Sequence, residues 1–450
     1  MKRLLFRSFR AFYLVKEWIV RRFTVGGLLV LGGLFVSAVV GLDTYQTVAY
    51  QAFTFLFALL MIAVAFSFIF RTPIKITRIL PKFGTVSERL VYRVVVDNLS
   101  SKSQSGLLFF ENPGSPLPTF EEFTNAQEPG EKRRNLFDRT VGYHRWEWLI
   151  SRKQGSRFKE HRLPLITPNG RKEITLEITP LNRGRLQFSG VTIARPDPFG
   201  LFNSLRMMSL RQSILVLPKR YPLPPVRLPG TRKYQSGGVA LASRVGDSEE
   251  FVSLRDYRPG DPLRKIHWKS WAKTDKPVVK EYQDEFFVRH GLILDTFQKA
   301  AHSEIFEEAV SVAASFACTI TTQESLLDLM FIGTDTYCFT SGRGLARTDK
   351  MLEILASVRS CTDKPFTDLP PLVFSRAHAL SGCICIFLAW DEQRKEFIGH
   401  LKEWGIPLLV LIVADGATNE AAVDLGPMKD SPNRFHLLAI GKIQEELAKL

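Results

Sequence analysis

Two long apolar runs near the N-terminus stand out in the pattern of hydrophobic and polar positions. Residues 23–42 and 48–70 contain no charged side chain, and only the short segment 43–47 separates them. A helix needs about 20 apolar residues to cross the hydrocarbon core of a bilayer, so each run is long enough. The pattern therefore predicts a transmembrane hairpin of two helices. A cleaved signal peptide does not fit, because the first run is too long and the second follows at once.

A basic stretch precedes the hairpin. Residues 1–22 contain seven Lys or Arg and one Glu, with apolar side chains between them. On a helix the charged residues share one side and the apolar residues another, which is typical of a helix that lies in a membrane interface. The alternative is a disordered basic tail. The charged side holds Arg3, Arg7, Arg10, Glu17 and Arg21, and the apolar side holds Leu5, Phe9, Phe12 and Ile19.

The distribution of charge predicts the orientation of the hairpin. The net charge is +15, and basic residues concentrate before residue 23 and at Arg71, Lys75 and Arg78, whereas the segment 43–47 has no Lys or Arg. Lys and Arg near membrane spans favour the cytoplasmic side. We therefore expect both termini and the bulk of the chain in the cytoplasm. The five cysteines, an odd number, suit a reducing compartment better than a disulfide framework.

Short alternating segments follow the hairpin. Residues 90–96 and 174–179 alternate apolar and polar side chains, and Pro, Gly and Asn mark turns between such segments. Region 76–218 is therefore predicted to be a β-sandwich of immunoglobulin-like type. Residues 100–165 are long and polar for a sandwich connection and are interpreted as an insertion. Its aromatic residues Tyr143, Trp146 and Trp148 would form either a partner-binding surface or a locally packed loop.

The pattern changes again after a linker at 219–248, which is rich in Pro and Gly. From 286 to 450, short apolar strands alternate with helical segments. Such alternation predicts a doubly wound α/β fold with a mostly parallel sheet and helices on both faces. Ligands of these sheets bind beyond the carboxyl ends of the strands, which places Asp295 and Asp391 at a candidate site.

The segment 249–285 is dense in charged and aromatic residues. Its pattern predicts a strand that ends at the turn 258–261, a helix that begins at Asp261 with a carboxylate cap, and a second strand at 278–282. Apolar residues recur between the charges, so the segment is not a simple solvated face. The residues singled out as an interaction site are Arg255, Tyr257, Pro259, Gly260, Asp261, Arg264, His267, Trp268, Lys269 and Glu281.

This segment resembles the signature of the bacterial domain of unknown function 58 family. The sequence departs from the family pattern at Trp271, where the family has a small residue, and at Lys273, where it has Arg. The segments 183–185 (RGR) and 197–202 (DPFGLF) extend the resemblance upstream. The matching residues of the signature are Leu254, Arg255, Tyr257, Pro259, Gly260, Asp261, Arg264, Ile266, His267, Trp268, Lys269 and Ala272.

Residues 286–450 in turn resemble a von Willebrand factor type A domain, the usual partner of the signature in this family. The metal-binding version of that domain has Asp-x-Ser-x-Ser after its first strand, where oxygen ligands hold a divalent cation. Here Phe297 and Lys299 replace both serines after Asp295. We therefore expect no cofactor. The alternative is a Mg²⁺ site held by Asp295 and Asp391.

Two further functions would use the signature differently. An enzyme would use His267 and Lys269, but no nucleophile elbow, phosphate-binding glycine loop or metal-spaced histidine pair accompanies them. Direct binding of nucleic acid is not expected, because acidic residues interleave with the basic ones and interrupt any positive groove.

The predicted protein is a non-enzymatic, multi-pass protein of the inner membrane, with contacts to lipid and to other membrane or envelope proteins. The family resemblance implies that it works as an adaptor beside a MoxR-type AAA+ ATPase, in the maturation of protein complexes or the biogenesis of the cell envelope. A Mg²⁺-dependent adhesion module and an uncharacterised enzyme are the alternatives.

Overall fold

The computed structural model describes residues 2–40, 47–68, 73–114, 117–126, 128, 130–131, 134–224, 251–261, 263, 266–282, 288–298, 303–321, 326–341, 345–415 and 424–450. The chain divides into an N-terminal unit, Met1–Pro218, and a C-terminal unit, Lys219–Leu450. The predicted hairpin loop at 43–46 and most of the linker, from residue 225 onward, lie outside the described residues.

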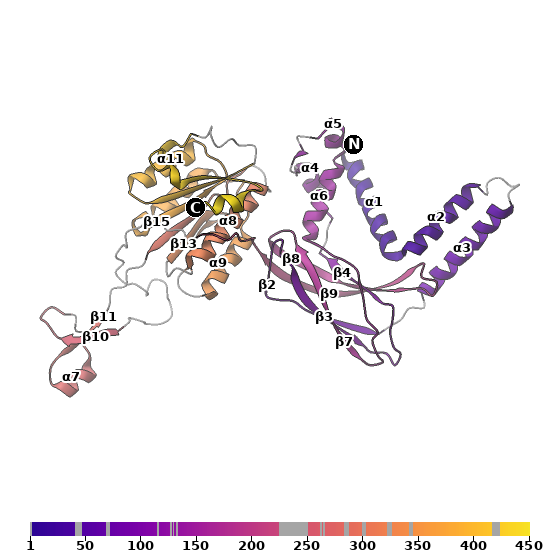
Figure 1. Cartoon of the computed structure of the whole chain (residues 1–450), viewed down its shortest axis with the longest axis horizontal. Helices are drawn as coiled ribbons and strands as arrows, with labels where there is room; N and C mark the ends of the chain where they lie inside the picture. The colour runs from indigo at the N-terminus through magenta and orange to yellow at the C-terminus, as the bar shows by residue number, and fades with distance from the viewer. Residues whose placement is uncertain are drawn as a thin grey trace. The chain divides into compact units, whose positions relative to one another are not determined.

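Three helices open the N-terminal unit (Figure 1). They are α1 (Lys2–Arg22), α2 (Val25–Val40) and α3 (Thr47–Ser67). Among the described residues, one helix, Val48–Ser67, is long and apolar enough to cross a membrane by length and composition, and almost none of it is buried. The other apolar helix is shorter, because the helical conformation is interrupted at residues 23–24, before α2 begins.

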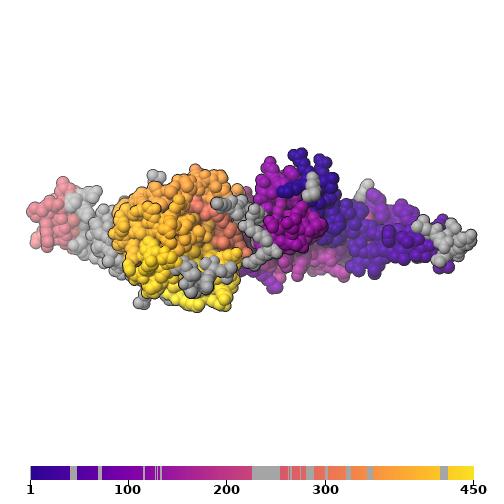
Figure 2. All heavy atoms as spheres, turned by 90° about the horizontal axis from the view of Figure 1, so that it is seen from above, coloured from indigo at the N-terminus to yellow at the C-terminus, as the bar shows by residue number. Residues whose placement is uncertain are grey.

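Helix α1 does not have the single apolar side that its sequence suggested. Phe6 and Phe9 pack against the helices of the 100–165 region, with ring centroids 5.5 and 6.1 Å from that of Trp146. Phe12, predicted on the same side, is 60% exposed. Figures 1 and 2 both show α1 beside that helical region. The helix therefore has one apolar side packed on protein, and further apolar residues that remain exposed.

Two sheets form a sandwich after the helices. Their facing residues share one core, in which Tyr92, Phe109 and Phe188 are buried almost completely. The first sheet has the order β1-β3-β7-β5 and is antiparallel, and the second has the order β2-β9-β8-β4-β6, antiparallel except for β2 with β9. The strands are β1 (Ile74–Ile79), β2 (Phe83–Thr85), β3 (Leu90–Asn98), β4 (Leu108–Pro113), β5 (Ser156–Arg157), β6 (His161–Arg162), β7 (Arg171–Pro180), β8 (Gly184–Pro196) and β9 (Asn203–Leu217).

The region 100–165 is not a single insertion into this sandwich. It supplies β4, which pairs with β8 inside the second sheet. It also supplies three helices, α4 (Phe120–Asn125), α5 (Leu136–Val141) and α6 (Tyr143–Gln154). Trp146 is only 2% exposed, and the aromatic patch packs against α1 rather than facing solvent as a surface for a partner.

The C-terminal unit contains the predicted sheet, with the strand order β14-β13-β12-β15-β16-β17. All pairs are parallel except β13 with β14. Figure 1 shows α8 and α9 on one side of the sheet and α11 on the other. Both faces are thus covered, and β15 is buried along its whole length, which explains why such strands read as unbroken apolar runs.

Cys383 and Cys385 lie in one core cluster of this sheet, and all five cysteines are free thiols. The strands are β12 (Arg289–Leu294), β13 (Leu326–Ile332), β14 (Thr336–Ser341), β15 (Gly382–Phe387), β16 (Leu408–Ala414) and β17 (Phe435–Ala439), and the helices are α8 (Glu304–Thr321), α9 (Leu345–Ser357), α10 (Leu369–Phe374), α11 (Glu392–Glu403) and α12 (Ile443–Leu447).

Candidate functional site

The signature forms a small arm of two strands and one helix. Strands β10 (Phe251–Asp256) and β11 (Val278–Tyr282) pair antiparallel, and α7 (Trp268–Thr274) lies between them in sequence. The backbone N–H of Tyr257 donates to the carbonyl of Pro277 at 2.9 Å and extends the pairing toward the turn. Arg264 lies outside the described residues, and Glu281 is described only as backbone in β11.

A bidentate ion pair holds the turn of the arm. The Nη1 and Nη2 atoms of Arg255 donate to the two carboxylate oxygens of Asp261, each at 2.7 Å. The same carboxylate accepts the backbone N–H of Arg258 at 2.8 Å. Between them Gly260 has φ +107°, which a residue with a side chain rarely adopts. Among the described residues, the carboxylate of Asp261 accepts from Arg255 and Arg258, and α7 begins at Trp268. Residues 262, 264 and 265, which would form the first turn that Asp261 was predicted to cap, lie outside the described residues.

The ion pair makes the arm sensitive to acid. Hydrogen bonds from Arg255 and from the Arg258 N–H lower the pKa of Asp261 from 3.8 to about 2. A group with a lowered folded pKa stabilises the folded state above its unfolded pKa and loses that contribution as the pH falls toward the folded value. We therefore expect the arm to loosen between about pH 4 and pH 2.

The variant Asp261→Asn is expected to loosen the arm already at neutral pH, because a neutral amide cannot form the charged bidentate pair. Hydrogen exchange at the amides of Tyr257 and His267, which bond to Pro277 and Val278, measures the effect. Asp275→Asn is the matched control, since Asp275 is an acidic residue of the same arm in a left-handed conformation that Asn tolerates. Equal exchange in both variants would contradict the assigned role of Asp261.

Two tryptophans of the arm stack on each other. Trp268 is 63% exposed, and its ring stacks on that of Trp271 with centroids 5.2 Å apart and planes at 17°. Leu263, before the helix, is 67% exposed. Large apolar side chains grouped on a surface commonly mark a site of protein binding. Trp271, where the sequence departs from the signature that it otherwise resembles, thus completes the aromatic surface.

His267 has the contacts of a structural residue. Its Nδ1 lies 2.6 Å from the hydroxyl of Ser270, and its backbone N–H donates to the carbonyl of Val278 at 2.8 Å. A catalytic base would be oriented by a carboxylate, whereas the ring partner here is a hydroxyl. The neighbouring Lys269 is exposed to solvent. The geometry places His267 at the junction of α7 and β11.

The aspartates of the sheet are held by an arginine that sequence reasoning missed. Asp295 is fully buried, and its Oδ2 accepts hydrogen bonds from Nε of Arg394 at 2.7 Å and from the N–H of Leu388 at 3.1 Å, while Nη2 of Arg394 lies 2.7 Å away. Its Oδ1 accepts the N–H of Phe297 at 2.9 Å. Nη1 of the same arginine lies 2.6 Å from Asp391, which also caps α11.

A guanidinium thus lies between the two carboxylates, where a divalent cation would have to lie. Both oxygens of Asp295 already accept protein donors, so the residues present do not fit a metal site built on this pair. Within the described residues, no group of three or more His, Cys, Asp or Glu side chains is arranged to hold a metal ion. Lys299 lies outside the described residues.

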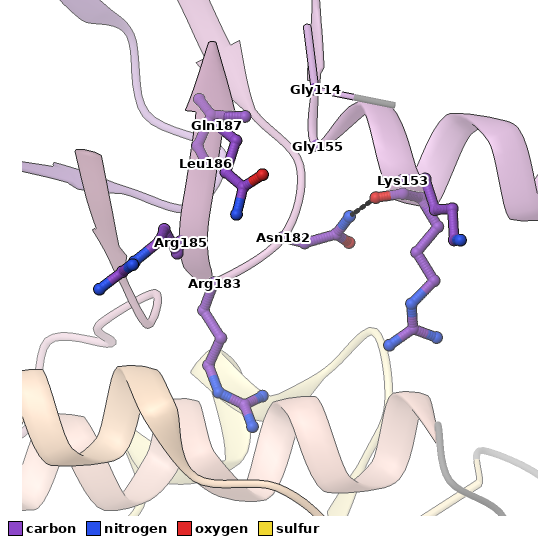
Figure 3. Close-up of a pocket in the computed structure, with 9 residues that line it drawn as sticks. Gly114, Lys153, Gly155, Asn182, Arg183, Arg185, Leu186 and Gln187 are labelled. Atoms are coloured by element: carbon purple, nitrogen blue, oxygen red, sulfur yellow. Dashed lines mark hydrogen bonds between the residues drawn. The ribbon is translucent and has the colours of Figure 1, made fainter. Parts of the chain in front are cut away.

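A basic cavity of about 260 Å³ opens in the N-terminal unit, beside the C-terminal end of α6 (Figure 3). The side-chain amide of Asn182 donates to the carbonyl of Arg152 at 2.8 Å and joins the loop before β8 to this helix. Arg183 and Arg185 leave the start of β8 in different directions, so the cations surround the cavity rather than converge on one point. Its lining is Gly114, Arg152, Lys153, Gly155, Asn182, Arg183, Arg185, Leu186 and Gln187.

Comparison with known proteins identifies the arm and the region after it. The family model described as "Protein of unknown function DUF58" matches residues 253–371. The Uncharacterized protein YeaD of Bacillus subtilis (strain 168) is 26% identical over 198 residues, which are 43% of this chain and 48% of the relative. Over this region the chain is similar to the DUF58 family. The chain spans about half the length of the curated relative that it matches.

Solved structures add little to the DUF58 assignment. The CARDB domain of PF1109 from Pyrococcus furiosus is 10% identical with a TM-score of 0.17 and covers 32% of this chain and 94% of its own. Red sea bream transglutaminase is 11% identical with the same TM-score of 0.17 and covers 32% of this chain and 15% of its own. At such scores, the description of the fold rests on the strand pairing alone.

Proposed function

We propose that the chain is a membrane-anchored, non-enzymatic adaptor whose signature arm docks a partner protein. The observation that carries this proposal is the exposed Trp268, stacked on the half-buried Trp271, on a hairpin whose turn is fixed by an ion pair. Indoles are the side chains most enriched among residues that dominate binding energy at protein interfaces. A rigid hairpin presents them with little loss of conformational entropy on binding.

The membrane part of the proposal is a two-helix hairpin of α2 and α3 in the inner membrane, with both termini and the bulk of the chain in the cytoplasm. The exposed apolar surfaces of both helices support insertion, since water solvates such surfaces poorly. The basic residues of α1 support the cytoplasmic side.

The proposed partner is a MoxR-type AAA+ ATPase, a partnership that the family resemblance implies. The chain would present clients to it in the maturation of protein complexes or the biogenesis of the cell envelope, together with other membrane or envelope proteins. We further propose that the β-sandwich is immunoglobulin-like and that the C-terminal unit is a von Willebrand type A-like domain that does not use a metal. Arg394 supports the last point, because its charge replaces that of a cation.

Two alternatives make different predictions. A Mg²⁺-dependent binding module would lose its partner on chelation and in the variant Asp295→Ala. An enzyme using His267 and Lys269 would show a turnover that His267→Ala abolishes while the fold is retained. The contacts of Asp295 and of His267 favour neither, so the adaptor is the function that the geometry supports best.

The double variant Trp268→Ala/Trp271→Ala is expected to lose the ATPase in a crosslinking pull-down of the full chain from native membranes. Loss of one hot-spot indole costs about 2 kcal/mol or more, which is at least about 30-fold in affinity. Capture by the wild-type chain is expected to persist in chelator.

Trp404→Ala is the matched control, because Trp404 is an indole of similar exposure, 52%, at the end of α11. Retention of the ATPase by the arm variant would refute docking through the arm. Loss of capture in chelator would instead favour the Mg²⁺-dependent module.

A further inference from the structure

The loop between β8 and β9, residues 197–202, is wedged between the two apolar helices. Leu201 and Phe202 form a core cluster with Ala63 of α3, and Val30 of α2 and Leu59 of α3 pack against it. At Gly27 a Cβ atom would lie 2.0 Å from the carbonyl oxygen of Leu201, so the backbones of helix and loop are in direct contact. We name residues 197–202 the wedge loop.

The contacts show how far along the helices the wedge loop reaches. Gly27, which meets the loop backbone, lies two residues beyond the start of α2 at Val25, or about 3 Å at 1.5 Å per residue. Ala63, which shares the core cluster with Leu201 and Phe202, lies four residues before the end of α3 at Ser67, or about 6 Å. The loop therefore reaches just past the helix ends, to the border of the apolar stretch.

The backbone N–H groups of the wedge loop all bond within the protein. The carboxylate of Asp197 accepts the N–H groups of Phe199, Leu201 and Phe202 at 2.9, 2.7 and 2.6 Å. The N–H of Asp197 donates to Phe202 and that of Gly200 to Asp197, both at 2.9 Å. The remaining residue, Pro198, has no N–H. Every backbone N–H of the loop thus has a protein acceptor, which removes the cost of bringing these donors close to lipid.

Thr24, just before α2, donates hydrogen bonds to two backbone carbonyls of the loop. Thr24 donates its backbone N–H to the carbonyl of Leu201 at 3.1 Å and its hydroxyl to the carbonyl of Gly200 at 2.5 Å. The side chain of Asp197, the one charge in the loop, is consumed by the N–H groups above, and the residue is 8% exposed. What the loop shows to its surroundings is apolar: Phe199, at the tip, is 51% exposed, with its ring centroid 6.5 Å from that of Phe66.

Arg22 lies on the other side of the contact between the wedge loop and the helices. Arg22 stacks on the ring of Phe202, with its guanidinium carbon 5.6 Å from the centroid, and donates to the carbonyl of Asn203 at 3.3 Å. An arginine just before an apolar helix is typical of the level at which lipid headgroups begin. The charge of Arg22 therefore lies outside the apolar stretch, whereas Phe199 lies beside the apolar stretch, near Phe66 of α3.

We propose that the wedge loop inserts into the bilayer interface, with Phe199 in contact with lipid, and so fixes one end of the sandwich at the membrane surface. This inference rests on the proposed anchorage of α2 and α3 in a membrane. It assigns the DPFGLF segment a lipid-contacting role, and it makes the loop and the hairpin one membrane-bound element.

The test places the photoreactive residue p-benzoylphenylalanine at position 199 of the full chain, reconstituted in nanodiscs of phosphatidylethanolamine and phosphatidylglycerol. After irradiation, peptide mass spectrometry detects lipid adducts. Position 55, a 67% exposed Phe within α3, is the positive control. Position 91, an exposed Val near the opposite end of the sandwich, is the negative control. All three side chains are exposed, so the substitution leaves the cores intact.

The expected result is lipid adducts at positions 199 and 55 and no lipid adducts at position 91. Adducts at 55 without adducts at 199 would overturn the insertion of the wedge loop and leave the anchorage standing. The absence of adducts at both positions would overturn the anchorage and the insertion together. Adducts at all three positions would show that the label does not discriminate depth, and the insertion would then fall as well.

Discussion

Replacing Arg394 with methionine is expected to destabilise the C-terminal unit by about 3–5 kcal/mol at neutral pH, the usual cost of leaving one member of a buried ion pair alone. Asp295 would keep its two backbone donors but lose the guanidinium. Urea unfolding of the full chain, followed by pulsed alkylation of the buried Cys383 and Cys385, measures the change within this sheet.

The deficit of this variant is expected to grow with pH. Burial raises the pKa of Asp295, and the charge of Arg394 opposes that rise. A carboxyl whose folded pKa exceeds its unfolded value favours the folded state below the unfolded pKa. The free energy of unfolding then falls as the pH rises from the unfolded pKa to the folded pKa. Without Arg394 the folded pKa rises further and the interval widens. The difference from wild type should therefore be small near pH 4 and largest at neutral pH.

The double variant Asp295→Asn/Arg394→Met separates charge from packing. Because it removes both charges, it is expected to recover much of the lost stability and to lose the pH dependence. If Arg394→Met alone were as stable as wild type at neutral pH, the guanidinium would not compensate a buried charge, and the assigned role of Arg394 would be wrong.

Gly27→Ala is expected to weaken the joint between α2 and the wedge loop by about 1–3 kcal/mol, the usual cost of forcing an extra methyl group into a packed site. The new methyl group would meet the Leu201 carbonyl oxygen at 2.0 Å, and backbone cannot turn away as a side chain does. Hydrogen exchange at the amides of Leu201 and Phe202 in nanodiscs measures the opening of the joint.

Gly32→Ala provides the matched control for this prediction. Gly32 lies in the same helix, and its added Cβ would meet nothing within 4 Å. Alanine favours a helix over glycine by about 1 kcal/mol, so this change alone should leave exchange unchanged or slower. Faster exchange in both variants would mean that the effect comes from the helix and not from the joint.

The parts of the fold that depend on local pattern could be predicted from the sequence. The unbroken apolar runs gave β12, β13, β15 and β16, because a strand covered on both faces has no polar side. Helix α6 carried a readable signal as well: Trp146, Leu149 and Ile150 recur at helical spacing, but the polar residues around them hid it.

Contacts between distant segments could not be predicted in the same way. Arg394 looks like one of several charges on the polar helix α11, and only the tertiary fold brings it 2.7 Å from Asp295, which is 99 residues earlier. The pairing of Phe6 with Trp146 likewise joins segments 140 residues apart. The contacts of Asp261 were ambiguous for a different reason. An aspartate before a proline can cap a helix or pair with an arginine, and in the structure its carboxylate pairs with Arg255.

The length of β8 sets a distance that matters for recognition. Twelve residues separate Arg185, in the lining of the basic cavity, from Asp197 in the wedge loop, which is about 40 Å along an extended strand. Counter-ions at physiological salt screen charges beyond about 8 Å. With the wedge loop at the membrane, the cavity lies at the opposite end of this strand. We therefore expect a soluble anion or an acidic protein segment, rather than phospholipid, to bind there.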